Sequence, residues 1–113
     1  MKSLWIITGL WGCAAVALGA IANHALDEVP ADGLAALETA SRYHLPHVAA
    51  AGLALVLSER AGRLALIAAA LFLASVVCFS GSIYVAVLTG VKIPIAPIGG
   101  IGFMIGWLLL GIS

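Results

Sequence analysis

Charged residues are scarce in this chain, and their scarcity indicates what surrounds it. Aspartate, glutamate, lysine and arginine make up only 9% of its 113 residues, and 64% are hydrophobic. A soluble domain carries roughly 25% charged residues. The mean hydropathy is also high, at +1.20. Lipid is therefore the predicted surrounding of most of the chain.

An excess of charge of either sign is missing as well. Five basic and five acidic residues give a formal net charge of zero, so no basic field exists to attract nucleic acid. Cysteine is rare, and both Cys13 and Cys78 lie within apolar runs, where a free thiol behaves as a small hydrophobe. We expect no nucleic-acid partner, and the cysteines predict neither a disulfide nor a metal site.

Long uncharged runs are what the chain has instead. They predict four membrane-spanning helices, at approximately residues 4–22, 43–58, 64–88 and 97–112. The first run would rise about 28 Å as a helix, close to the thickness of a bilayer core. It also resembles a secretory signal, but its length and the later runs favour a helix that is retained. We predict one all-α membrane domain, a compact four-helix bundle.

The second span depends on the polar segment before it. Its uncharged core, residues 45–57, would rise only about 20 Å as a helix. The missing turns must come from an amphipathic helix that we expect to begin near Gly33, with Asp32 as its N-cap. Glu38 and Arg42 are four residues apart, which predicts an ion pair on that helix.

The basic residues predict the orientation. Lys2, Arg60 and Arg63 fall on one side of the predicted membrane, and Arg42 and Lys92 on the other. Cytoplasmic loops retain Lys and Arg, so both termini are predicted to lie in the cytoplasm.

Small residues mark the predicted seams between helices, because membrane helices associate through close backbone approach. The packing positions that we single out are Ala15, Gly19, Ala74, Cys78, Ser82, Gly99, Gly100, Gly102 and Gly106. Gly102 and Gly106 could form either a dimer contact or a seam within the chain. We favour the seam within the chain.

The segment "SRYHLPH", residues 41–47, crowds polar groups at the start of the second span. Pro46 supplies no backbone donor, so the carbonyl of Arg42 loses its usual partner and a kink is expected. In a bilayer each unsatisfied polar group costs several kcal/mol. We therefore predict that one outer cluster of polar side chains lies close together: His24, Glu38, Arg42, Tyr43, His44 and His47.

Four motifs occur in an order that resembles a known family. They are "HAL" at 24–26, "ETASRYHLPH" at 38–47, "FSGSIYVAVLTG" at 79–90 and "APIGGIGFMIGW" at 96–107. They resemble the bacterial domain-of-unknown-function 423 family, whose eukaryotic relatives are the transmembrane protein 256-like proteins. Ala96 stands where the family commonly has threonine, so no hydroxyl is essential there. The resemblance implies a small multi-pass protein of the bacterial cytoplasmic membrane, without an established activity.

Three active roles for the polar cluster compete with a structural one. Zinc or copper would suit His24, Glu38 and His47, with His44 nearby, but the spacing matches no recognised metal motif. A proton or ion path would use the same histidines, yet no acid or base lies within the first, third or fourth span.

The third active role is catalysis, with a histidine as base and Ser80 or Ser82 as nucleophile, but nothing near these serines in sequence activates a hydroxyl. We therefore predict no enzyme and no cofactor. The favoured function is a structural or accessory one, in which the partners are the lipid bilayer and either another membrane protein or a second copy of the chain.

Overall fold

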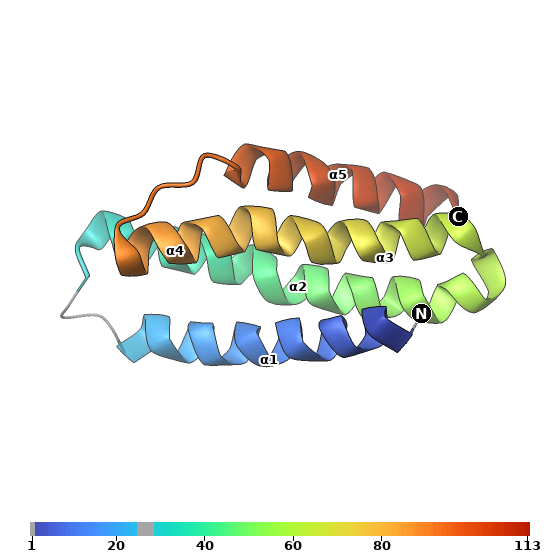
Figure 1. The fold of residues 1–113 in the computed structure, drawn as a ribbon, viewed down its shortest axis with the longest axis horizontal. Helices are drawn as coiled ribbons and strands as arrows, with labels where there is room; N and C mark the ends of the chain where they lie inside the picture. Colours follow the sequence, from blue (N-terminus) through green and yellow to red (C-terminus); the bar gives the residue numbers. More distant parts are fainter. Residues whose placement is uncertain (1, 25–28) are drawn as a thin grey trace.

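A computed structural model describes residues 2–24 and 29–113. All regular elements of the described part are helices, which confirms the all-α part of the predicted fold class. Its elements are α1 (Lys2–His24), α2 (Ala31–Ala61), α3 (Arg63–Val76), the π-helix η1 (Val77–Gly81), α4 (Ser82–Thr89) and α5 (Ala96–Ile112). The helices α3, η1 and α4 follow one another without a break and together form one continuous helical rod. With α1, α2 and α5, the described residues form four such rods, which lie side by side (Figure 1).

Two of these rods are long and apolar enough to cross a membrane. Among the described residues they are Lys2–His24 and Arg63–Thr89, whose most apolar 18-residue stretches have mean hydropathies of 2.0 and 2.4. The helix α5 is equally uncharged but shorter, at 17 residues. These helices coincide with the uncharged runs of the sequence. In an apolar environment the backbone N–H and C=O groups find no water, so they must pair with one another, and a helix pairs them within one segment.

The rod formed by α3, η1 and α4 lies with α2 in the middle of the bundle. Helix α1 packs mainly on α2, and α5 packs on α3 and η1 from the other side (Figure 1). Fully buried alanines line the contact between α2 and α3, among them Ala51, Ala54, Ala68 and Ala69. Small side chains here let the two backbones approach closely, which is how membrane helices gain packing energy.

The start of α2 corrects two predictions. The helix begins at Ala31, directly after Pro30, which holds the N-cap position. The carbonyl of Pro30 accepts the first helical hydrogen bond, from the N–H of Leu34 at 3.0 Å. Asp32 is thus inside the first turn, where its carboxylate accepts the N–H of Gly33 at 3.0 Å, and the prediction of Asp32 as N-cap was wrong.

The predicted ion pair on α2 is also not formed. The side chains of Glu38 and Arg42 are both exposed, and no ion pair joins them within the described part of the chain. Two long, solvated side chains gain little from holding one geometry. The helix itself continues through Pro46 to Ala61, as a single element of 31 residues.

Glycines on α5 lie against α3 and η1. A Cβ added at Gly106 would meet the Phe72 ring at 2.6 Å, and one added at Gly102 would overlap the side chain of Ser75. A Cβ at Gly99 would meet the backbone nitrogen of Phe79 at 2.5 Å. This seam therefore lies within the chain, and no larger residue fits at these three positions.

The remaining packing positions vary in their surroundings. Ala15 and Ser82 are buried, and Cys78 is half-buried, whereas Ala74 is exposed. A Cβ at Gly19 would have nothing within 4 Å, and one at Gly100 would touch only Phe79, at 3.9 Å. The hydroxyl of Ser82 donates back to the carbonyl of Phe79 at 2.9 Å, so it bonds within its own rod.

Candidate functional site

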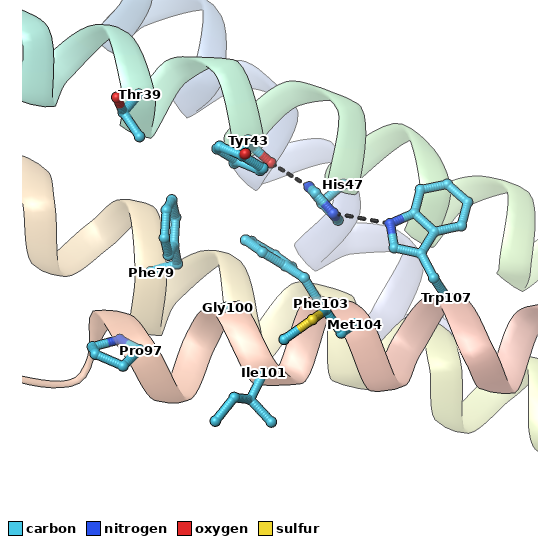
Figure 2. Close-up of a pocket in the computed structure, with 10 residues that line it drawn as sticks. All are labelled: Thr39, Tyr43, His47, Phe79, Pro97, Gly100, Ile101, Phe103, Met104 and Trp107. Atoms are coloured by element: carbon cyan, nitrogen blue, oxygen red, sulfur yellow. Dashed lines mark hydrogen bonds between the residues drawn. The ribbon is translucent and has the colours of Figure 1, made fainter.

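The imidazole of His47 lines a pocket, and both of its ring nitrogens are engaged (Figure 2). Its Nδ1 is 2.6 Å from the carbonyl oxygen of Tyr43. The indole Nε1–H of Trp107 donates to its Nε2 at 3.0 Å. A carbonyl can only accept, so Nδ1 carries the proton and Nε2 offers its lone pair to Trp107. This geometry requires a neutral imidazole, which joins α2 to α5.

Aromatic rings surround this imidazole. His47 stacks on Phe103 with ring centroids 3.7 Å apart, and Trp107 meets the His47 ring edge-on at 5.9 Å. Tyr43 lies parallel to Phe103 at 6.4 Å, and Phe79 meets Tyr43 edge-on at 5.2 Å. Stacked and edge-on pairs are the arrangements that aromatic quadrupoles favour, so the rings fix one another in place.

The pocket has a volume of about 590 Å³ and lies between α2, η1 and α5. Its wall includes the five rings, and the other lining residues are Thr39, Pro97, Gly100, Ile101 and Met104 (Figure 2). None of its lining residues is charged. An uncharged, ring-walled pocket of this size suits a small apolar ligand, and it holds no constellation for acid–base or nucleophilic chemistry.

The π-helix η1 shapes one wall of the pocket. Phe79 faces Tyr43 and Phe103, whereas the hydroxyl of its neighbour Ser80 is fully buried and donates to the carbonyl of Ala40 on α2 at 2.8 Å. Phe79 thus contacts the rings of the pocket, while Ser80 bonds the backbone of α2. Short π-helical turns often occur at functional sites, and this turn borders the pocket.

A second polar contact lies on another face of α2. The Nδ1 of His44 is 3.0 Å from the hydroxyl of Tyr84 on α4, and the side chain of His44 is only 3% exposed. On α1, the indole N–H of Trp11 donates to the carbonyl of Leu73 at 3.1 Å. Each of these bonds joins a different pair of rods.

The structure does not bring the six predicted cluster residues together. Tyr43 and His47 are in contact, but His44 turns to Tyr84 instead, and Glu38 and Arg42 are exposed. No group of three or more His, Cys, Asp or Glu side chains is placed to hold a metal ion in the parts of the chain that the structure describes.

His24, the first member of the predicted cluster, lies far from His47. A Cβ at Gly12 of α1 would be 3.6 Å from Val48, the residue after His47. His24 is twelve residues further along α1, which is about 18 Å. The partner expected from α1 is supplied by Trp107 of α5 instead.

Sequence reasoning singled out Tyr43 and His47 but missed the other three rings of this site, Phe79, Phe103 and Trp107. Phe103 and Trp107 are four apart on α5, opposite Tyr43 and His47, which are four apart on α2. The available signal was Trp107 itself, since an indole N–H within an apolar helix needs an acceptor. Phe79 gave no such signal, because a phenylalanine in an apolar run is what any buried helix contains.

Comparison with known proteins identifies the family of this chain. The family described as "Protein of unknown function (DUF423)" matches residues 18–100. The chain belongs to this family. The match includes Tyr43, His47 and Phe79 but ends before Phe103 and Trp107, so two of the five rings of the wall lie outside it.

Relatives extend over the whole chain. It is 30% identical to the UPF0382 membrane protein YwdK of Bacillus subtilis (strain 168), in an alignment covering 100% of this chain and 96% of the relative. It is 36% identical to the UPF0382 membrane protein SAB0533 of Staphylococcus aureus (strain bovine RF122 / ET3-1), in an alignment covering 100% of this chain and 95% of the relative. It is 36% identical to a UPF0382 membrane protein of Haemophilus influenzae, covering 97% and 92%. No solved structure matches the chain. This member of the DUF423 family is a helical membrane protein.

Proposed function

We propose that the chain crosses the bacterial cytoplasmic membrane four times, with both termini in the cytoplasm, and acts there as a non-catalytic accessory protein. Several of its polar side chains support this role, because they join one helix to another. Trp107 bonds His47, Trp11 bonds Leu73, and Ser80 bonds Ala40.

The outer face of α1 is the observation that carries the accessory role. Only 6% of the 18-residue apolar stretch of this helix is buried inside the fold. Leu10 and Val16 expose 57% and 67% of their surfaces. Something apolar must cover this face, and lipid and a second membrane protein both could. We propose that a partner protein packs against it.

The distribution of basic residues supports the proposed topology. Both termini lie at the end of the bundle where α2 turns into α3 (Figure 1). Lys2, Arg60 and Arg63 belong to that end, while Lys92 lies in the connection to α5 at the other. Cytoplasmic ends of membrane proteins are enriched in Lys and Arg.

Reporter fusions test the topology. Alkaline phosphatase fused after Ser113 should be inactive, since it would stay in the cytoplasm, and the same enzyme fused after Gly90 should be active. High activity of the Ser113 fusion would contradict the proposal.

Site-specific crosslinking tests the accessory role. Benzoylphenylalanine placed at Leu10 or Val16 should give one protein adduct of discrete mass when cells are irradiated. Ile98 and Leu108 on α5 are equally exposed, at 62% and 69%, and serve as matched controls that should give none. An adduct of twice the chain mass would identify a second copy as the partner. Lipid adducts alone at both α1 positions would show that α1 has no protein partner.

A metal, ion or proton site built on the histidines has less support. The Nε2 lone pair of His47 already accepts the indole of Trp107, and its Nδ1 already donates to a carbonyl. Binding a cation there would require breaking a bond that holds α5 to α2.

A further inference from the structure

The pocket between α2, η1 and α5 has the size of a ligand site. Its volume of about 590 Å³ falls within the roughly 300 to 1,000 Å³ of typical small-molecule pockets. No charged side chain lines it. A charged guest would therefore lose its hydration without gaining a counter-charge, so the pocket selects uncharged molecules.

The rings of the wall favour a flat guest. Tyr43 and Phe103 are parallel to within 12°, and Phe79 meets both of them edge-on. A conjugated ring entering the pocket would gain stacked or edge-on contacts beyond those of simple burial. A flexible acyl chain would gain only burial, and it would lose conformational freedom on binding.

The hydroxyl of Tyr43 is the hydrogen-bond donor that remains for a guest. The other polar ring groups of the wall are engaged, since the Nδ1 of His47 bonds a carbonyl and Trp107 bonds its Nε2. The hydroxyl of Thr39 donates to the carbonyl of Ala35 at 3.0 Å. The Tyr43 hydroxyl forms no hydrogen bond with any residue that the structure describes, and its side chain is 43% exposed, so the O–H is open to a guest.

We infer that this pocket binds an uncharged, lipid-soluble molecule that carries a flat conjugated ring and a carbonyl oxygen, and that the hydroxyl of Tyr43 donates to that oxygen. The inference rests on α2 and α5 lying within the bilayer, as proposed above. It does not depend on the accessory role.

Gly100 provides a way to close the pocket without disturbing the fold. A Cβ there would touch only the edge of the Phe79 ring, at 3.9 Å, in contrast to the tight contacts at Gly99. Gly100→Leu should therefore fill the pocket and leave the helix seam in place. Gly19→Leu is the matched control, because a Cβ at Gly19 has nothing within 4 Å.

Photolabelling of the full chain in lipid nanodiscs tests the inference. The probe is benzophenone, which has two rings joined by a carbonyl and reacts with nearby C–H bonds when irradiated. We expect saturable labelling at Met104, mapped by mass spectrometry and displaced by 1,4-naphthoquinone. Gly100→Leu should abolish it, and Gly19→Leu should leave it unchanged.

Tyr43→Phe isolates the hydrogen bond. This variant keeps the ring and removes only the hydroxyl, so its melting temperature should equal that of the wild type. Its affinity for benzophenone should fall about fivefold, the equivalent of one ordinary hydrogen bond. Equal affinity in both proteins would overturn the role of Tyr43.

Other outcomes would overturn the ligand class. Labelling that does not saturate, or that survives in Gly100→Leu, would show that no site exists. Displacement by hexadecane as strong as by naphthoquinone would show a slot for acyl chains. The reporter fusions and the α1 crosslinks succeed or fail independently of these results, so failure of the proposed function would remain distinguishable.

Discussion

The two outer helices, α1 and α5, are held to the middle of the bundle in different ways. On α5, three glycines lie so close to α3 and η1 that no Cβ fits. On α1, a Cβ at Gly9 or Gly19 would meet nothing within 4 Å, and the buried residues in the described helix are two alanines, Ala15 and Ala22. Glycine in an apolar helix therefore marks close backbone approach at three positions of α5 and open surface at two positions of α1.

The polar contacts of the two outer helices differ in the same way. Close packing on α5 buries Phe103 and lets Trp107 reach His47, so van der Waals contact and a hydrogen bond support each other. The packing of α1 is looser, and the indole of Trp11 provides its cross-link to α3. A tightly seated helix suits a pocket wall, whereas a loosely seated one suits a surface that a partner covers.

The largest expected effect is at the α5 seam. Replacing Gly106 with leucine forces a side chain into the Phe72 ring, which lies 2.6 Å from the added Cβ. Overpacking of this kind costs about 3 kcal/mol, the upper end of the usual range. The melting temperature in detergent should fall sharply for Gly106→Leu and for Gly102→Leu, and not for Gly111→Leu, whose Cβ has nothing within 4 Å. Unchanged melting of the first two variants would place α5 against lipid on this face.

The next effect is at the link between α2 and α5. His47→Ala removes the acceptor of the Trp107 indole and the ring stacked on Phe103, and the lost hydrogen bond and the lost ring contact together cost roughly 1 to 3 kcal/mol. Trp107→Phe removes the donor instead. The double variant should then be less destabilised than the sum of the two single ones, because the two residues share one bond. Additive losses in chemical unfolding would mean that the bond contributes nothing.

The rods of this fold could be predicted from the sequence more completely than the site. The uncharged runs 64–88 and 97–112 correspond to α3–η1–α4 and α5, because apolar length alone decides where a helix fits a bilayer. Asp32 suggested the wrong start, because Pro30, with φ −57° and ψ 156°, holds the N-cap position two residues earlier. The local pattern could not show which cap prevails.

The site depends on contacts between distant segments. His47 and Trp107 are 60 positions apart, and nothing in either local pattern says which helix faces which. We expected His24 to lie in one cluster with His47. Helices α1 and α2 are neighbours, but His47 lies on the side of α2 that faces α5. Helical spacing in the sequence shows which residues share one face of a helix, but it does not show which other helix packs against that face.

A smaller effect should follow from loosening α1. Trp11→Phe keeps most of the apolar surface and removes the bond to the Leu73 carbonyl, at 3.1 Å. The loss should be about 1 kcal/mol, the typical net worth of one hydrogen bond. Hydrogen exchange should rise in α1 and stay unchanged in α5. A rise of equal size in both helices would contradict the view that they are attached independently.

The smallest effect on stability is expected at Gly19, and it separates stability from association. A leucine there points away from the rest of the chain, and surface substitutions of this kind usually change stability by less than about 0.5 kcal/mol. The added side chain does alter the shape of the outer face of α1, which also contains Val16. If a partner protein packs on that face, Gly19→Leu should leave the melting temperature unchanged and weaken the crosslink from benzoylphenylalanine at Val16, because shape complementarity is lost. If lipid alone covers α1, the acyl chains will adapt to the leucine, and the adducts formed at Val16 will not change in kind or amount.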